Sequence, residues 1–291
     1  MIKDLPAPSR PATRPLRVTP ARRAVLAVGV PVAAAIIGAT AFSLVADVGT
    51  GHYPLKYTIP ISDGRLTMNA GGGDLALQGT SGSGAAHLTG TVDYTFVRPQ
   101  VSLTHPGGQG TVFSFRCRIS IGNCALNSTA AIPAATAATI STDGGNLSAS
   151  DLTGAVSLSS DGGNLAATDL AGNASLQTGG GDLTAVQLTG DAHLGTNGGN
   201  ITATSIDSPR VTADSGGGDV EIVFTRIPQY VQVAADGGNV TIVVPDVPGG
   251  YDVTTSTDGG NLNESVPVDT SSPRKITASS GGGDITIEQS P

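Results

Sequence analysis

Asp143-Gly144-Gly145-Asn146-Leu147 opens the stretch that decides the fold, because this turn recurs along the second half of the chain. Eight such turns lie between residues 143 and 284, and their last residues are spaced by 18, 18, 18, 19, 20, 22 and 23 positions. A similar turn, Gly71-Gly72-Gly73-Asp74, stands alone upstream. A repeat of about twenty residues indicates a solenoid, since one short unit cannot bury its apolar face alone.

Apolar residues alternate on both sides of each turn. An aliphatic residue follows every turn, and two positions later the side chain is again apolar in seven of eight repeats, with Glu264 as the exception. Two more apolar columns precede the turns at alternate positions. The pattern predicts an all-β chain whose residues 141–291 form a β-solenoid, a parallel β-helix or roll-like stack of two-strand coils. The paired glycines are expected to take positive φ at the corner.

The polar residues of the turns follow a rule of charge. A turn that ends in Asp begins with Gly, and a turn that ends in Asn begins with Asp or Asn, so no turn carries two carboxylates. In a stack, equivalent positions of adjacent coils lie close together, and like charges would repel there. We therefore expect a ladder of limited charge, in which Asn amides bond to neighbouring coils.

Composition narrows the range of functions. Aromatic residues make up 3% of the 291 residues, Trp is absent and Gly occurs 41 times, which suits thin coils better than a bulky core. Residues 47–291 carry nine basic and twenty-two acidic residues, a net charge of −13. This acidity argues against nucleic-acid binding, which requires a basic surface.

The first forty-six residues differ from the rest. Residues 1–23 are rich in Pro and Arg and are predicted to form a disordered, basic cytoplasmic tail. Residues 24–46 contain no charge and are long enough to span a bilayer about 30 Å thick as a single transmembrane helix. The positive-inside rule then places residues 47–291 outside the cell. A cleaved signal peptide ending near Ala39-Thr40-Ala41 is the alternative, and it also exports the domain.

Residues 47–140 have strand texture but looser spacing, and we expect opening coils with a hairpin that covers the edge of the solenoid. Cys117 and Cys124 lie in this region and form a candidate disulfide, which outside the cell is favoured over free thiols. A tight turn at Gly122-Asn123 would leave Cys117 out of register, so the disulfide requires a wider loop. At the far end, Glu288 and Pro291 are expected to blunt the last strand.

Candidate functional residues lie in the longer segments of the later coils. These segments should gather on the side opposite the glycine turns and form a binding face of Arg226, Tyr230, Tyr251, Arg274 and Lys275. One-sided insertions in repeat proteins often mark the binding face, although ordinary variation of loop length is the alternative. No catalytic motif, metal site or cofactor site is predicted. Calcium stacking along the turns stays an alternative, although one carboxylate per turn falls short of the six to eight oxygens that calcium binds.

Two further pieces carry a family resemblance. Ala131-Ile132-Pro133-Ala134 leads into Ile140-Ser141-Thr142-Asp143-Gly144, and Val244-Pro245-Asp246 is followed by Tyr251-Asp252-Val253. With the repeat itself, these pieces resemble the bacterial "putative adhesin" β-strand-repeat domain of unknown function over about residues 55–289. The resemblance implies a membrane-anchored, surface-exposed β-solenoid and brings no catalytic residues.

These observations favour a non-enzymatic, single-pass membrane protein whose extracellular domain adheres to, or binds, a cell-wall or surface component. Two alternatives are an accessory sensor of an envelope-stress signalling system and a calcium-binding repeat protein. A polysaccharide-cleaving enzyme on a β-helix scaffold is a third, although such enzymes line their grooves with aromatic and basic residues, which this chain has in small number.

Overall fold

Two facing β-sheets make up the described part of the chain, which in the computed structural model comprises residues 50–82, 84–106, 110–118 and 122–290. Sheet A has 12 strands and sheet B has 11. Within these residues no helix is long and apolar enough to cross a bilayer. The predicted cytoplasmic tail (1–23) and transmembrane helix (24–46) lie outside the described residues.

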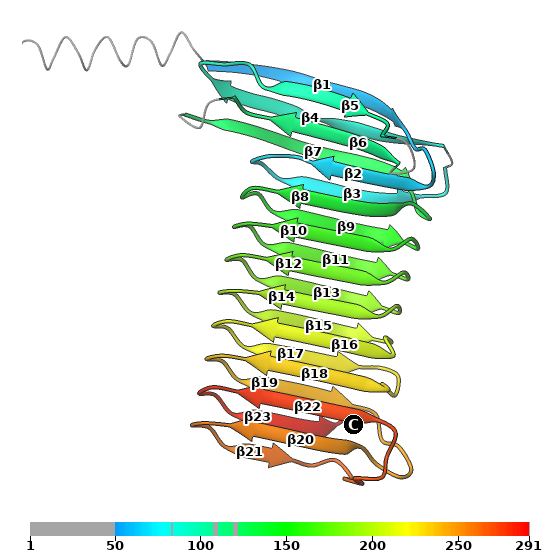
Figure 1. The fold of residues 1–291 in the computed structure, drawn as a ribbon, viewed down its shortest axis with the longest axis vertical. Coiled ribbons are helices and arrows are strands. Elements are labelled where there is room, and N and C mark those ends of the chain that lie inside the picture. The colour runs from blue at the N-terminus through cyan, green and yellow to red at the C-terminus, as the bar shows by residue number, and fades with distance from the viewer. Residues whose placement is uncertain (1–49, 83, 107–109, 119–121, 291) are drawn as a thin grey trace, which may run out of the picture. The chain divides into compact units, whose positions relative to one another are not determined.

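Each regular coil consists of a strand in sheet B, the glycine turn and a strand in sheet A (Figure 1). The first is β8 (Ala137–Thr142) with β9 (Leu147–Leu152). The next coils are β10 (Val156–Ser160) with β11 (Leu165–Leu170), β12 (Ala174–Thr178) with β13 (Leu183–Leu188), β14 (Ala192–Thr196) with β15 (Ile201–Ile206), β16 (Arg210–Ser215) with β17 (Val220–Phe224), and β18 (Tyr230–Ala235) with β19 (Val240–Val244).

The coils stack in parallel and in register. Leu165 lies beside Leu147 on one side and Leu183 on the other, and the same holds for Ala167 between its neighbours. The inward columns of both sheets are buried and form one continuous core. The predicted alternation of two short strands per coil is therefore confirmed, because each inward side chain finds its partner in the adjacent coil rather than in its own.

At the N-terminal end the chain order departs from the stacking order. Beyond β8 and β9 come β2 (Arg65–Asn69) and β3 (Leu75–Thr80), and beyond these β6 (Thr111–Arg116) and β7 (Cys124–Pro133). The end is completed by the antiparallel strands β1 (Thr50–Pro60), β4 (Ala85–Thr95) and β5 (Gln100–Thr104). The turn at residues 71–74, isolated in the sequence, thus joins the column of glycine turns.

At the C-terminal end the last coil in the sequence is not the last coil of the stack. The strands β22 (Lys275–Ser280) and β23 (Ile285–Gln289) insert between two other coils. On one side lies the coil of β18 and β19, and on the other lies the coil of β20 (Asp252–Thr257) and β21 (Leu262–Glu264). The expectation that Glu288 and Pro291 protect the final edge was therefore wrong for Glu288, which lies on an internal strand. The long segment of residues 265–274 lets the chain return and fill this place.

The terminal coil carries polar residues where other coils carry core residues. Glu264 and Thr255, the exceptions in their columns, form a hydrogen bond of 2.6 Å across the open end. Leu262 on the same coil is 51% exposed. No further coil covers this surface within the described residues, so a polar pair suits it better than an apolar one.

The glycine turns require glycine for a reason other than the expected one. None of the glycines in the eight repeat turns lies in the left-handed region, and the prediction of positive φ was wrong. A Cβ on Gly163 would instead overlap the carbonyl oxygen of Gly145, and Gly181 stands in the same relation to Gly163. Close stacking of the corners, not backbone handedness, excludes other residues at this third position of the turn. Left-handed φ occurs at the opposite corner, at Asp151, Asp169, Gln187 and Ser205.

A ladder of hydrogen bonds joins the coils at the last residue of the turn. In every turn except that of the terminal coil, the last residue accepts, through its side-chain oxygen, the backbone N–H of its counterpart in the adjacent coil. For example, the N–H of Asn164 donates to Asn146 at 3.0 Å, and the N–H of Asp182 donates to Asn164 at 2.9 Å. In stacking order the acceptors are Asn127, Asp74, Asn146, Asn164, Asp182, Asn200, Asp219, Asn239 and Asp284. No two Asp residues are adjacent in this ladder, which limits repulsion between the coils.

Candidate functional site

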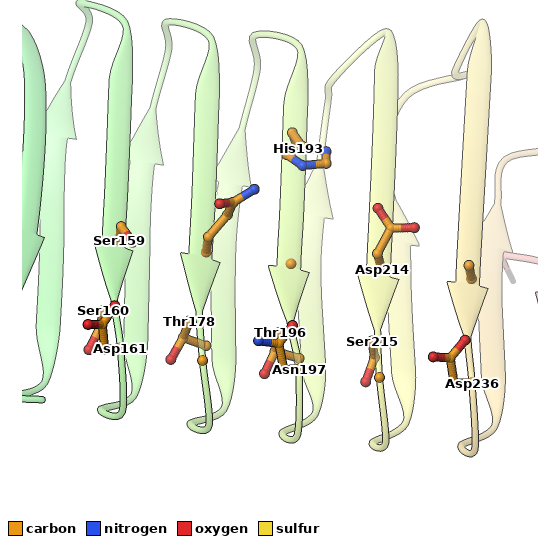
Figure 2. A pocket seen from close by; sticks show the side chains of 15 residues that line it. Ser159, Ser160, Asp161, Thr178, His193, Thr196, Asn197, Asp214, Ser215 and Asp236 are labelled. Carbon is orange, nitrogen blue, oxygen red and sulfur yellow. The ribbon is translucent and has the colours of Figure 1, made fainter. Parts of the chain in front are cut away.

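The outer face of sheet B is hollowed at two places that share His193. The first, which we call the turn-side hollow, has a volume of about 470 Å³ and runs across β10 to β18 near the glycine turns. Its outward side chains include Ser159, Gln177, His193 and Asp214. Figure 2 shows His193 and Asp214 on neighbouring strands, above the row of hydroxyls that precedes the turns.

Gly195 explains the depth of the turn-side hollow. It lies on the outer face of β14, between Gln177 on β12 and Asp214 on β16. Because Gly195 has no side chain, a gap opens between these two longer residues. Asp161 and Asp236 lie at the turn edge of the same hollow. The hollow therefore offers hydroxyl, amide and imidazole groups together with carboxylates.

The row of hydroxyls at its turn edge is already engaged in structure. Ser160 donates to the carbonyl oxygen of Gly145 at 2.9 Å and accepts the N–H of Gly163 at 3.0 Å. Thr196 makes the equivalent two bonds to Gly181 and Gly199. These side chains are buried, and both functions of each hydroxyl are used to hold one coil to the next.

The second hollow, the loop-side hollow, has a volume of about 570 Å³ and lies at the other side of the same face. His193 and Thr212 border it from the middle of the sheet, while Arg210, Tyr230 and Asp191 border it near the loops. Small residues form much of its floor. One face of the sheet thus carries two adjoining depressions of different chemistry.

The basic residues near the loop-side hollow are paired with acids from neighbouring coils. Nε of Arg226 lies 2.9 Å from Oδ1 of Asp207, and Nη1 of Arg210 lies 3.8 Å from Oδ2 of Asp191. A third pair is Lys275 with Asp252 at 3.6 Å. These three ion pairs link successive loops and offset the charge of the cations that form them.

Four of the five residues of the predicted binding face lie on the loop side of the stack, and the fifth is buried. Tyr230 and Lys275 are neighbours in register on β18 and β22, and Arg226 and Arg274 lie in the segments that lead into these strands. Tyr251, in contrast, is fully buried, and its hydroxyl donates to the carbonyl oxygen of Pro245 at 2.8 Å. Burial raises its pKa to about 12. Its inclusion in the binding face was wrong, because the segment of residues 245–251 folds inward over the core.

Sequence reasoning missed the centre of the face. His193, Gln177, Asp214 and Arg210 were not predicted as site residues. The signal was present at Gly195, which occupies an outward strand position between two polar residues. Its significance depends on which coils are neighbours, and that follows only from the stacking register.

Cys117 and Cys124 form a disulfide with a Cα–Cα distance of 6.3 Å. It closes the loop that joins β6 to β7, at the place where other coils have the glycine turn. The two strands belong to different sheets, so the loop is wider than a tight hairpin turn.

The turn carboxylates take part in the ladder of backbone hydrogen bonds. Asp182, for instance, accepts the N–H of Asn200 at 2.9 Å. Among the described residues no group of three His, Cys, Asp or Glu side chains is arranged to hold a metal ion.

Three solved structures are similar to this chain at low identity. A putative adhesin from Bacteroides fragilis NCTC 9343 shares 18% identity, with 82% of this chain and 97% of that chain covered and a TM-score of 0.49. A putative adhesin from Parabacteroides merdae ATCC 43184 shares 14%, covering 82% and 96% with a TM-score of 0.46. A putative cell adhesion protein from Clostridium sporogenes ATCC 15579 shares 13%, covering 82% and 100% with a TM-score of 0.27.

No curated protein matches the chain. The family model described as Toastrack DUF4097 matches residues 58–290, which include nearly all of the described strands. This match agrees with the resemblance found in the repeat and with the two stacked sheets. The chain belongs to the Toastrack DUF4097 family.

Proposed function

We propose that this protein is a membrane-anchored, surface-displayed β-solenoid that binds an envelope or cell-surface polymer through the outer face of sheet B, without catalysing a reaction. The observation that carries the proposal is the pair of adjoining hollows that share His193. They form one depressed track that crosses the strands from β8 to β18.

An extended ligand suits this track. Neighbouring strands of a sheet lie about 4.8 Å apart, so a chain laid across them meets a new side chain at each strand. Ser159, Gln177 and His193 supply hydrogen-bonding groups along this direction. Tyr230 adds a half-buried ring at the loop edge, where it can pack against a sugar or another flat group. A polar polymer such as a glycan fits these features.

The uncharged run of residues 24–46 would anchor the protein, with residues 47–291 outside the cell. The Cys117–Cys124 disulfide supports this location, because disulfides persist in oxidising compartments. The absence of catalysis is supported by the hydroxyls at the turn edge, whose donors and acceptors are already used between coils.

Binding to purified cell-wall polymers tests the proposal. The full chain carrying Tyr230→Ala and Gln177→Ala should bind about tenfold more weakly, because two lost contacts of about 0.7 kcal/mol each have this effect. Thr184→Ala with Glu221→Gln, on the outer face of sheet A, is the matched control and should bind normally.

If the sheet B variant and the sheet A control bind the polymer equally well, the outer face of sheet B is not the ligand-binding surface. Release of soluble fragments from the polymer by the unmodified protein would show an enzyme and contradict the proposal on that point.

A further inference from the structure

The two sheets end unequally at the N-terminal end of the stack. Sheet A extends one strand beyond sheet B, so β1 has no strand opposite it. Its inward residues alternate with outward ones, and Leu55 and Ile59 still reach the core. Tyr57 shares their face but is 37% exposed, although its ring meets the buried ring of Phe113 edge-on at 5.9 Å. An inward-facing aromatic residue is thus left uncovered at the end of the rod.

More aromatic rings and a cation gather beside it. The rings of Tyr53 and Tyr94 meet edge-on with centroids 6.1 Å apart, and the guanidinium carbon of Arg98 lies 4.6 Å from the Tyr53 ring centroid. We call Tyr53, Tyr57, Tyr94 and Arg98 the N-terminal ledge. Such a group combines apolar rings, hydroxyl tips and a positive charge that stacks on an aromatic face.

Formal charge divides the domain along its length. Residues 50–130 carry five basic and three acidic residues, a net of +2, whereas residues 131–291 carry four basic and eighteen acidic residues, a net of −14. Arg116 and Arg118 add two exposed cations at the same end as the ledge. An anionic surface would therefore attract this end of the stack and repel the rest.

The ledge also lies close in the chain to the proposed membrane anchor. Four backbone steps join Ala46, the last residue of the uncharged run, to Thr50, the first residue of β1. At 3.8 Å for each step they span at most about 15 Å. If the run spans a bilayer, the start of β1 is held near its surface.

We propose that the N-terminal ledge contacts the headgroups of an anionic lipid bilayer and holds the solenoid at the membrane by its N-terminal end; this rests on the proposed anchor of residues 24–46. Tyr side chains sit at the level of lipid headgroups because their rings are apolar and their hydroxyls are polar. Arg98, Arg116 and Arg118 are attracted to the lipid phosphates. The acidic coils then extend away from the surface, which leaves the track on sheet B free for a ligand.

The absence of Trp from the chain permits a clean fluorescence test. The full chain is reconstituted, one copy per disc, into lipid nanodiscs whose acyl chains carry bromine, which quenches Trp at short range. Tyr57→Trp places the reporter on the ledge, and Leu262→Trp places it on the exposed coil at the opposite end as the matched control. Tyr94→Trp serves as a second ledge reporter should Tyr57→Trp disturb folding.

We expect the ledge reporters to be quenched in discs of phosphatidylglycerol with phosphatidylcholine, and the Leu262→Trp reporter to be unaffected. Adding Arg98→Gln and Arg116→Gln to Tyr57→Trp should lower the equilibrium constant for contact with the bilayer by roughly fivefold for each cation removed, and the quenching should fall accordingly. Arg210→Gln with Arg226→Gln, two cations away from the ledge, should leave the quenching unchanged.

The outcomes separate this inference from the proposed anchor. A chain that does not enter the discs contradicts the anchor. A chain that enters them but shows equal quenching at Tyr57→Trp and Leu262→Trp, or none at either ledge reporter, contradicts the ledge contact alone. A change in the fluorescence of the ledge reporters that appears only when two copies share a disc would show that the ledge contacts a second copy of the chain. That result would also overturn the proposal.

Discussion

At the scale of single residues, the stack is held by positions that repeat from coil to coil. The glycine at the third position of the turn leaves room for the neighbouring corner, and the side chain of the Asn or Asp after it accepts the next backbone N–H. A buried Ser or Thr before the turn bonds both to its own turn and to the adjacent one. Each bond satisfies a backbone group that would otherwise be buried unpaired, which is costly.

One coil lacks the buried hydroxyl, and this leads to a prediction. Ala235 occupies the position that is Ser or Thr in the other repeat turns, and it is 3% exposed. Ala235→Ser should donate to the carbonyl oxygen of Gly218 and accept the N–H of Gly238, as Ser215 does one coil away. We expect unfolding in urea to require about 1 kcal/mol more.

Ala234→Ser is the control for this change, since residue 234 faces outward on the same strand. It should alter stability by less than about 0.5 kcal/mol. Equal effects of the two substitutions would mean that the ladder of hydroxyls contributes no specific stability.

At the scale of elements, the turn of each coil determines how tightly its two strands are joined. Most coils use the glycine turn, while the coil of β6 and β7 uses the loop closed by Cys117 and Cys124. That coil lacks the compact corner that stacks on its neighbours. A covalent link compensates, because it restricts the unfolded chain and keeps the two strand ends together.

Replacing both cysteines with serine should therefore destabilise the domain, by about 2 kcal/mol for a loop of this size. The loss should be local, with faster amide exchange in β6 and β7 and unchanged exchange in β12 to β15. Hydrogen-exchange mass spectrometry would measure both. A uniform increase along the whole stack would contradict a local role for the disulfide.

At the scale of the whole molecule, both ends of the solenoid interlock. Near the N-terminus, β2 and β3 are enclosed by a coil that comes later in the sequence; near the C-terminus, β22 and β23 are enclosed by a coil that comes earlier. In each case the inner coil pairs on at least one side with a coil that is not its neighbour in sequence: β2 and β3 pair with β8 and β9, and β22 and β23 pair with β18 and β19. These long-range pairings fasten the ends of a stack whose middle rests on contacts between successive repeats.

The interlock at the C-terminal end can be tested by truncation after Glu264. Without β22 and β23, the coil of β20 and β21 loses every strand it pairs with. Residues 252–264 should then exchange their amide hydrogens at the rate of an unfolded segment, while β10 to β15 stay protected. Continued protection of 252–264 would show that this coil moves into the vacated place beside β18 and β19.

The sequence by itself determined the repeat, the two strands of each coil and the inward columns, because these depend on spacing and alternation within about twenty residues. It also marked Glu264 as an exception, since an apolar column makes a polar residue visible. Only the tertiary structure decided the order of the end coils, the burial of Tyr251 and the hollow at Gly195. Those features depend on which distant segments become neighbours, and similar repeats can pair in more than one order with nearly the same local contacts.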